Sequence, residues 1–302
     1  MMTIQEVNAK TLSNGMNRKD YFDSVVDWYS QGAMEFNGHF IKKLDIPYDT
    51  VSDRQKYDVY MPIKPGLYPT VILVHGGGWF TGDRSDFGLS LCLPYIAHGF
   101  TVVTIGYRLA DEAVYPDPVN DVCKAMQQIF HHAEEYRIDV NRVAMQAGSA
   151  GTTIAALAAL RNPDLIKSVI LRCAILDFKN IRPQYEEIGL QRERFKYPDE
   201  DTSIEALFMG GSTLELPDVA DQCNPANHLS ADCPNFLLIH GLVDVDTPYQ
   251  QSIQFARAIR EVSGDNSRAE LVLLAETGHD NGRYDDPSTF ETQLDFLKRT
   301  LR

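Results

Sequence analysis

The stretch Gln146-Ala147-Gly148-Ser149-Ala150-Gly151 decides the fold that this chain can adopt. Before it, residues 140–145 include a short apolar segment that is typical of a buried strand. After it, the run Thr-Thr-Ile-Ala-Ala-Leu-Ala-Ala-Leu favours a helix. Ser149 therefore lies between strand and helix with small neighbours on both sides, which is typical of a nucleophile elbow of the type G-x-S-x-G. Ala147 replaces the first glycine, and small-residue turns also precede helices in other proteins, so the motif needs support from the rest of the chain.

The composition indicates a soluble globular protein. The chain has 302 residues, of which 44% are hydrophobic and 23% charged, enough to form one large domain with its own core. A net charge of −14 would repel nucleic acid, so we expect no such partner. We also expect no membrane insertion, because no stretch approaches the ~18 apolar residues of a span. The N-terminus has no signal-peptide pattern and the five cysteines have no metal-like spacing, so we expect a cytoplasmic protein.

Strand-like and helix-like segments alternate along most of the chain. After two strands between Phe40 and Met61, buried strands are predicted at 69–75, 100–107, 168–178, 235–240 and 270–275, besides the strand before the elbow. Helices are predicted at 84–98 and 118–135, after the elbow, before Gly264 and from Phe290 to Leu301. This alternation predicts an α/β protein with a mostly parallel central sheet and helices on both faces.

Two segments depart from the alternation. Residues 18–30 show the spacing of an amphipathic helix with an aromatic face, which is explained by packing or by a covering role. Residues 179–231 are polar and rich in proline, and we interpret them as an insertion. Within the insertion we expect one short helix, opened by a capping box from Thr202 to Glu205 and closed by Gly210-Gly211.

The motif His75-Gly76-Gly77-Gly78-Trp79 follows a predicted buried strand. Three consecutive glycines cost backbone entropy, and either a tight turn or exposed backbone N–H groups would explain them. Such N–H groups stabilise the oxyanion of an acyl-transfer intermediate. A phosphate-binding loop is the weaker interpretation, because no Lys-Ser/Thr pair follows and G-x-G-x-x-G is absent.

The glycine motif at 75–79, followed along the chain by the elbow at 146–151, resembles the motifs of the α/β-hydrolase fold. Within that fold, the chain resembles the hormone-sensitive-lipase-like and feruloyl-esterase-like carboxylesterases. Gly76–Arg84, Tyr107–Leu109 and Tyr115–Pro118 are also similar to that group. The resemblance covers roughly residues 45–180 and 233–300 and departs from the pattern at Ala147 and Thr152. It implies a single α/β-hydrolase domain over 1–302, with an N-terminal cap segment at about 1–40 and a small lid at about 179–231.

The order of the triad in this fold, serine then acid then histidine, selects the remaining candidates. His279 is the only histidine after residue 240, and it lies in a turn after the last predicted strand. Asp244 and Asp246 both follow the penultimate strand, in a loop that resembles the family's H-G-x-x-D-x-x-x-P pattern. Matching positions favours Asp244, with Asp246 as the alternative. His75 and His240 are interpreted as packed or hydrogen-bonded turn residues.

The resemblance implies specific roles for these positions. Ser149 would be the nucleophile, His279 the general base and Asp244 the residue that orients it. The backbone N–H groups of Gly77, Gly78 and Ala150 would form the oxyanion hole, with Gly76 as a rival for one of them. Trp79 would be a substrate-binding wall of the pocket mouth, or else a packing residue. Neither a metal nor an organic cofactor is expected.

We therefore predict a serine carboxylesterase that hydrolyses short-chain acyl esters through an acyl-enzyme. Its partner would be a small-molecule ester substrate, and the resemblance suggests a homodimer. Two other enzymes remain open: an arylformamidase-like amide hydrolase, because of the stretch from Asp53 to Tyr60, and an acetyl or feruloyl sugar esterase. Outside enzymes, the fold also includes non-catalytic ligand-binding proteins, in which the triad is usually incomplete.

Overall fold

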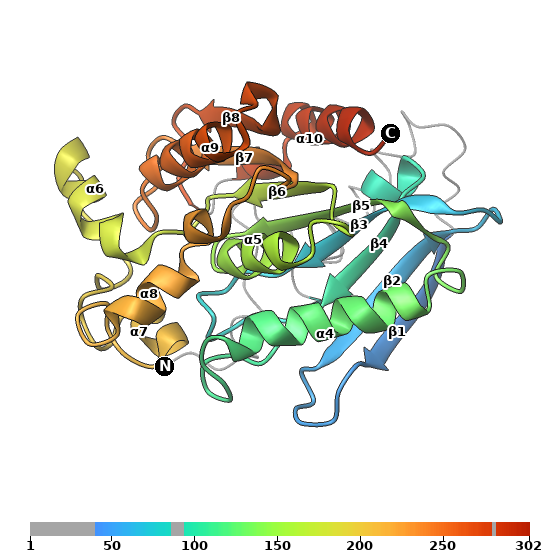
Figure 1. Ribbon diagram of the computed structural model, residues 1–302, viewed down its shortest axis with the longest axis horizontal. Helices are drawn as coiled ribbons and strands as arrows, with labels where there is room; N and C mark the ends of the chain where they lie inside the picture. Colours follow the sequence, from blue (N-terminus) through green and yellow to red (C-terminus); the bar gives the residue numbers. More distant parts are fainter. Residues whose placement is uncertain (1–39, 86–93, 280–281) are drawn as a thin grey trace.

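The computed structural model describes residues 40–85, 94–279 and 282–302, which form a central sheet flanked by helices (Figure 1). The helix predicted at 18–30 and nearly all of the expected cap segment lie outside the described residues. Most of the helix predicted at 84–98 does too, although residues 94–97 are helical. In the described part of the chain, no helix is both long and apolar enough to cross a membrane.

Eight strands of the described chain form one sheet in the order β1-β2-β4-β3-β5-β6-β7-β8. Only the pairings of β1 with β2 and of β2 with β4 are antiparallel. The mostly parallel sheet is thus confirmed, and the carboxyl ends of β3, β5, β6, β7 and β8 meet at one edge. The strands are β1 (Phe40–Pro47), β2 (Lys56–Pro62), β3 (Tyr68–Val74), β4 (Thr101–Ile105), β5 (Ile138–Gly148), β6 (Ser168–Arg172), β7 (Asn235–Gly241) and β8 (Ala269–Leu274).

Helices cover both faces of the sheet because the buried strands are apolar on both sides. Phe236 and Leu238 of β7 belong to the same core cluster as α9, whereas Leu237 and Ile239 belong to the cluster that includes α10. Helices α4 and α5 share the first face with α9. The main helices are α4 (Asp117–His131), α5 (Gly151–Arg161), α9 (Gln250–Ser263) and α10 (Pro287–Thr300).

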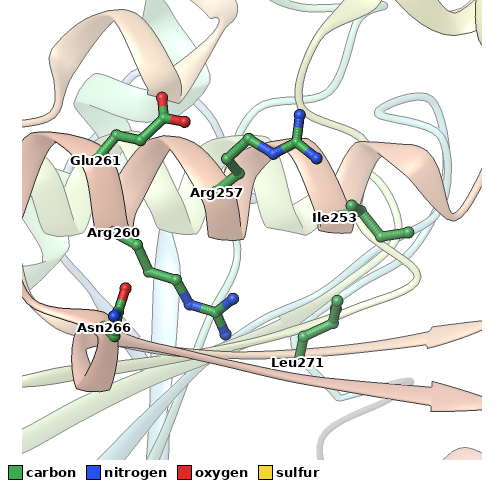
Figure 2. A pocket seen from close by; sticks show the side chains of 6 residues that line it. All are labelled: Ile253, Arg257, Arg260, Glu261, Asn266 and Leu271. Carbon is green, nitrogen blue, oxygen red and sulfur yellow. The ribbon is translucent and has the colours of Figure 1, made fainter.

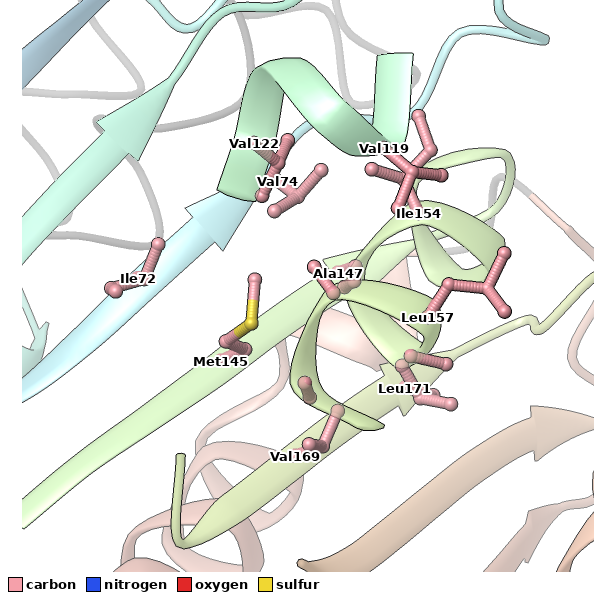
Figure 3. Packing of buried hydrophobic residues seen from close by; sticks show 14 of the residues in the cluster. Ile72, Val74, Val119, Val122, Met145, Ala147, Ile154, Leu157, Val169 and Leu171 are labelled. Atoms are coloured by element: carbon pink, nitrogen blue, oxygen red, sulfur yellow. The ribbon is translucent and has the colours of Figure 1, made fainter. Parts of the chain in front are cut away.

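Dense packing holds α5 against the sheet. In Figure 3, Ile154 and Leu157 of α5 lie among side chains from α4, β3, β5 and β6. Most of the other residues of α5 are small, so the helix axis can approach the strands closely. Each large aliphatic side chain that is fully buried contributes about 1.5–3 kcal/mol. The start of α5, and with it the turn that carries Ser149, is therefore held in place by the core.

The strand predicted at 168–178 ends earlier than expected. β6 stops at Arg172, because Cys173 has a φ of 42° and takes the chain out of the extended conformation. The next residues are buried without being a strand, and their backbone groups bond to side chains instead. The N–H of Ile175, for example, donates to the hydroxyl of Thr152 at 3.0 Å. Continuous hydrophobicity predicted burial here, but not the end of the strand.

The insertion at 179–231 contains more helix than predicted. All of it is described, and it has three α-helices, α6 (Ile181–Ile188), α7 (Ile204–Met209) and α8 (Pro217–Cys223), besides the 3₁₀ turns η1 (Phe178–Asn180) and η2 (Pro225–His228). The predicted capping box is wrong, because α7 is capped by Ser203, whose hydroxyl accepts a hydrogen bond from the Ala206 N–H at 3.0 Å. The helix does end at Gly210, which is left-handed as expected.

A buried ion pair fastens the insertion internally and to the rest of the domain. The side chains of Arg192 and Glu205 are both fully buried, and their two hydrogen bonds are 2.7 and 3.0 Å long. Arg192 also donates to the carbonyl of Lys196 at 2.7 Å and to the carbonyl of Asp246 at 2.9 Å. Glu205 therefore neutralises the arginine that links the insertion to the loop after β7.

We expect Glu205→Gln to lower the free energy of unfolding by about 3–5 kcal/mol, because the charge of Arg192 would remain buried without its counter-ion. Urea unfolding would measure this. The matched control is Asp221→Asn, which removes the partly exposed ion pair with Lys179 and should cost less than about 1 kcal/mol. Equal effects of the two substitutions would contradict the prediction. The double variant Arg192→Met/Glu205→Leu should recover much of the loss.

Candidate active site

Ser149 occupies a sharp turn between β5 and α5. Its φ is 52°, a left-handed conformation that is uncommon for residues other than glycine. Hydrogen bonds hold the turn on both sides: the Ser149 N–H donates to the carbonyl of Arg172 at 3.0 Å, and the Thr152 N–H donates to the carbonyl of Ser149 at 2.9 Å. The strained backbone thus persists because the sheet and the helix fix it.

Glycines let this turn approach the end of β3. A Cβ atom on Gly151 would lie 2.5 Å from the carbonyl oxygen of His75, and one on Gly76 would lie 2.8 Å from the carbonyl oxygen of Gly148. Neither position can carry a side chain without backbone movement. A Cβ on Gly148 itself would meet nothing closer than 4.0 Å. Ala147 is a buried member of the core cluster, so a methyl group is accommodated at that elbow position.

Three of the candidate residues come together from separate loops. The Nε2 atom of His279 lies 2.8 Å from Oγ of Ser149, and its Nδ1 atom lies 2.8 Å from Oδ2 of Asp244. A carboxylate can only accept, so Nδ1 carries the proton and Nε2 is free to accept one from the serine hydroxyl. The loops after β5, β7 and β8 supply these side chains at the edge where the parallel strands end.

Asp244 is a buried carboxylate with hydrogen bonds to both of its oxygens. Oδ1 accepts from the backbone N–H groups of Asp246 and Thr247, both at 2.9 Å. Oδ2 accepts from His279 and from the hydroxyl of Thr247, at 3.1 Å for the latter. Burial alone would raise the pKa of Asp244, but the charges and hydrogen bonds of His279 and His240 outweigh it and hold this pKa well below its usual range. The carboxylate therefore stays ionised.

Asp246, the alternative acid, is occupied elsewhere. Its Oδ2 atom is paired with the guanidinium of Arg194, which comes from the insertion. Asp244, Asp246 and His279 offer ligand atoms within 4.8 Å of one another, close enough to hold a metal ion. However, Nδ1 of His279 and Oδ2 of Asp244 are hydrogen-bonded to each other, and the charge of Arg194 already neutralises the carboxylate of Asp246. This donor set suits a hydrogen-bonded triad better than a metal centre.

The glycine motif presents backbone N–H groups beside the serine turn. Gly77 and Gly78 have φ angles of 107° and 63°, which L side chains rarely adopt. The carbonyl of Gly77 accepts hydrogen bonds from Phe80 and Thr81 and so closes the loop. Among the described residues, the N–H groups of Gly77, Gly78 and Ala150 have no hydrogen-bond acceptor. They are thus available to an anionic oxygen near Ser149.

Trp79 lies in the core. Its side chain is fully buried, with the indole stacked on Phe208 at 4.7 Å and edge-on to Phe178 at 5.5 Å. Packing, the alternative that the sequence left open, describes this environment better than a wall of the pocket mouth. The exposed aromatic of the loop is Phe80, which lies against Gly78 and was not singled out from the sequence. Trp79 has a left-handed φ of 61°, which turns its ring inward and leaves that of Phe80 exposed. No sequence pattern signals this conformation.

The sequence analysis did not place Thr247 or His240 in the site, yet both side chains touch the carboxylate of Asp244. Thr247 contacts it through its hydroxyl, and His240 approaches Oδ2 to 3.3 Å. His240 is also hydrogen-bonded within the turn, as expected. His75 is packed as expected, with its ring stacked on Tyr107 at 4.3 Å. The only sequence signal for His240 is its position four residues before the acid.

A pocket between α9 and β8 lies outside this arrangement. Figure 2 shows Arg257 and Arg260 of the helix above Leu271 of the strand. Arg260 is already hydrogen-bonded to the carbonyl of Ala269, at 2.7 and 3.1 Å. The lining of this pocket contains no serine, cysteine or histidine that could act as a nucleophile or base. This pocket therefore offers no serine or cysteine nucleophile with a histidine base.

Comparison with known sequences gives one family. Residues 57–259 match the model of the BD-FAE family. A probable carboxylic ester hydrolase of Mycobacterium tuberculosis, LipM, is 27% identical over 213 residues, which are 66% of this chain and 46% of that protein. An acetyl esterase of Salmonella choleraesuis is 32% identical over 207 residues, 67% of this chain and 57% of that protein. The chain spans about half the length of the curated relatives it matches.

Solved structures support the fold. A truncated carbohydrate esterase from gut microbiota has a TM-score of 0.77 with this chain at 20% identity. The match covers 89% of this chain and 99% of that one. At this identity the likeness shows the fold alone, and the α/β-hydrolase fold expected from the sequence is thus confirmed.

We expect Gly151→Ala to lower the free energy of unfolding by about 1–3 kcal/mol, because the new methyl group would overlap the carbonyl oxygens of Val74 and His75. The control is Gly148→Ala, three residues earlier, where the space is open and unfolding should change by less than about 1 kcal/mol. Urea denaturation of both variants decides the matter. If Gly151→Ala is as stable as the control, the close approach is not as tight as described.

Proposed function

The chain belongs to the BD-FAE family, and on this premise we propose that it is a serine esterase that hydrolyses short-chain carboxylic esters. Ser149, His279 and Asp244 would be its catalytic triad. The observation that carries the proposal is the continuous line of two 2.8 Å hydrogen bonds from the serine hydroxyl through His279 to a buried carboxylate. This is the arrangement that turns a weakly acidic hydroxyl into a nucleophile.

Acylation begins when Nε2 of His279 takes the proton of the Ser149 hydroxyl. Oγ then attacks the ester carbonyl, and a tetrahedral intermediate with an anionic oxygen forms. The free N–H groups of Gly77, Gly78 and Ala150 donate hydrogen bonds to this oxygen, which is the charge that develops in the transition state. Asp244 holds His279 in the required tautomer and stabilises its protonated form.

Collapse of the intermediate releases the alcohol, which takes the proton from His279. The acyl group stays on Ser149 as an ester. Water then enters, gives a proton to Nε2 of His279 and attacks the acyl carbon. A second tetrahedral intermediate breaks down to the free acid, and His279 returns the proton to Oγ of Ser149. The cycle uses groups of this chain, the ester and one water molecule.

The preference for a short acyl group is the finer part of the proposal. The Salmonella choleraesuis relative is an acetyl esterase by name, and its identity with this chain is 32%, against 27% for the Mycobacterium tuberculosis relative. Within the loop next to Ser149, the large side chain of Trp79 is packed inward, against Phe178 and Phe208. Both observations fit a small acyl group better than a long one.

We expect Ser149→Ala to reduce kcat for p-nitrophenyl acetate and butyrate by about 10⁴-fold or more, because the nucleophile is lost. The wild type should hydrolyse these esters faster than the octanoate. The control is Ser168→Ala, which removes a different serine hydroxyl, one that is buried at the opposite edge of the sheet, and should leave kcat unchanged. A wild type that is inert on all three esters, or an alanine variant that remains active, would refute the proposal.

The pair Asp244→Asn and Asp246→Asn tests which acid serves the triad. Asp244→Asn should lower kcat by about 10⁴-fold, because an amide in place of the carboxylate favours the wrong tautomer of His279. Asp246→Asn disturbs only the pairing with Arg194 and should have a far smaller effect. Steady-state kinetics on p-nitrophenyl acetate distinguishes the two. The reverse order of effects would transfer the role to Asp246.

A further inference from the structure

A second histidine reaches the carboxylate that orients His279. His240 is near the end of β7, and its side chain is fully buried, as is that of Asp244. Its Nε2 atom lies 3.1 Å from the carbonyl oxygen of Thr247 and 3.3 Å from Oδ2 of Asp244. Its Nδ1 atom lies 2.7 Å from the hydroxyl oxygen of Ser252, at the start of α9. The esterase cycle derived above makes no use of this ring.

The surroundings of His240 define its tautomer. A carbonyl and a carboxylate both face Nε2, and both only accept, so Nε2 carries a proton. The Ser252 hydroxyl faces Nδ1 and can donate to it. His240 thus has partners on both nitrogens, with the N–H of Nε2 directed at the groups of the acid loop. Ser252 sets this orientation from a separate element.

Oδ2 of Asp244 is shared between the two histidines. His279 donates to it from Nδ1 at 2.8 Å, and His240 approaches it from Nε2 at 3.3 Å. A hydrogen bond from a second donor draws negative charge away from the first. The more strongly His240 polarises Oδ2 of Asp244, the less negative charge that oxygen offers to stabilise the protonated form of His279. The basicity of His279 therefore depends on whether His240 donates.

We propose that His240 is a positioning residue of the triad, which donates from Nε2 to the acid loop and thereby limits the basicity of His279. It acts through Asp244 and touches neither the serine nor the ester. The proposal rests on the esterase function proposed above, because the basicity of His279 matters only if His279 is the general base. The low pKa of Asp244 supports it, since His240 contributes to that shift after burial and His279.

Other charged and titratable groups around Asp244 stay the same when His240 is replaced. The insertion contributes Tyr185, whose hydroxyl donates to the carbonyl of Asp244 at 3.4 Å, and the acid loop contributes Asp246. Tyr284, before α10, interacts with the charge of Asp244, and its hydroxyl accepts from the Gly241 N–H at 2.8 Å. Arg194 pairs with Asp246, and Arg192 binds its backbone. A change in the pH profile of a His240 variant can therefore be assigned to the lost donor, provided that a donor-retaining variant does not show it.

The test compares His240→Leu, which removes the donor, with His240→Gln, which keeps an N–H at nearly the same reach. The kcat/KM of p-nitrophenyl acetate hydrolysis is measured against pH, and its acidic limb reports the pKa of His279 in the free enzyme. Protonated His279 cannot act as a base, so a higher pKa moves this limb to higher pH. We expect the pKa of His279 to rise by ~0.5–1 unit in His240→Leu and to change little or not at all in His240→Gln.

A milder pair keeps the test valid if His240→Leu does not fold. Ser252→Ala removes the hydroxyl that orients the ring and should move the acidic limb in the same direction by a smaller amount. Ser168→Ala is its matched control, because that serine is also fully buried with a 2.7 Å hydrogen bond, but lies at the opposite edge of the sheet. Ser168→Ala should leave the limb in place.

A titration of His279 by NMR, with ring-labelled histidine, gives a second readout that needs no substrate. A pKa of His279 that rises in Ser252→Ala and His240→Leu but not in His240→Gln supports the proposal. Unchanged pKa values, with only thermal stability reduced, overturn it and leave His240 a structural residue. If the wild type lacks Ser149-dependent activity, the proposed esterase function fails, and the titration still decides whether His240 controls His279.

Discussion

The close approach of two backbone turns is the constraint on which the rest of the site depends. The loop after β3 and the turn after β5 come so near that neither Gly76 nor Gly151 has room for a methyl group. This proximity brings the glycine loop next to the turn that carries Ser149. It is possible only because β3 and β5 are neighbours in a parallel sheet, so that their carboxyl ends lie side by side.

A hydrogen-bonded loop supports the site from the other side. Asp244 is surrounded by donors from its own loop, from His279 and from His240, and its charge is therefore stable despite burial. The insertion reaches the same loop through Arg192 and Arg194, which bind the backbone and the side chain of Asp246. The insertion is thus part of what holds the acid loop, and deleting it would remove both of these contacts.

The sequence predicts most of the fold because parallel strands, buried on both faces, leave continuous apolar runs. It also predicts which loops carry Ser149, Asp244 and His279, since these loops follow strands whose order the chain itself gives. Residues 179–231 are harder, because their short helices are stabilised by tertiary contacts such as that of Glu205 with Arg192, 13 residues apart. The inward turn of Trp79 and the end of β6 at Arg172 depend on single left-handed residues. Local periodicity contains no information about them.

The contact between Arg192 and the carbonyl of Asp246 bears on how this architecture can diversify. A backbone carbonyl is present in every residue, so the attachment survives replacement of the side chain at that position. The Arg192–Glu205 pair does not tolerate such replacement, because a chain that keeps only one of the two buried charges loses stability. Recombination between related chains would therefore exchange the segment from Arg192 to Glu205 as a block, and the acid loop of the recipient would still offer it a docking point.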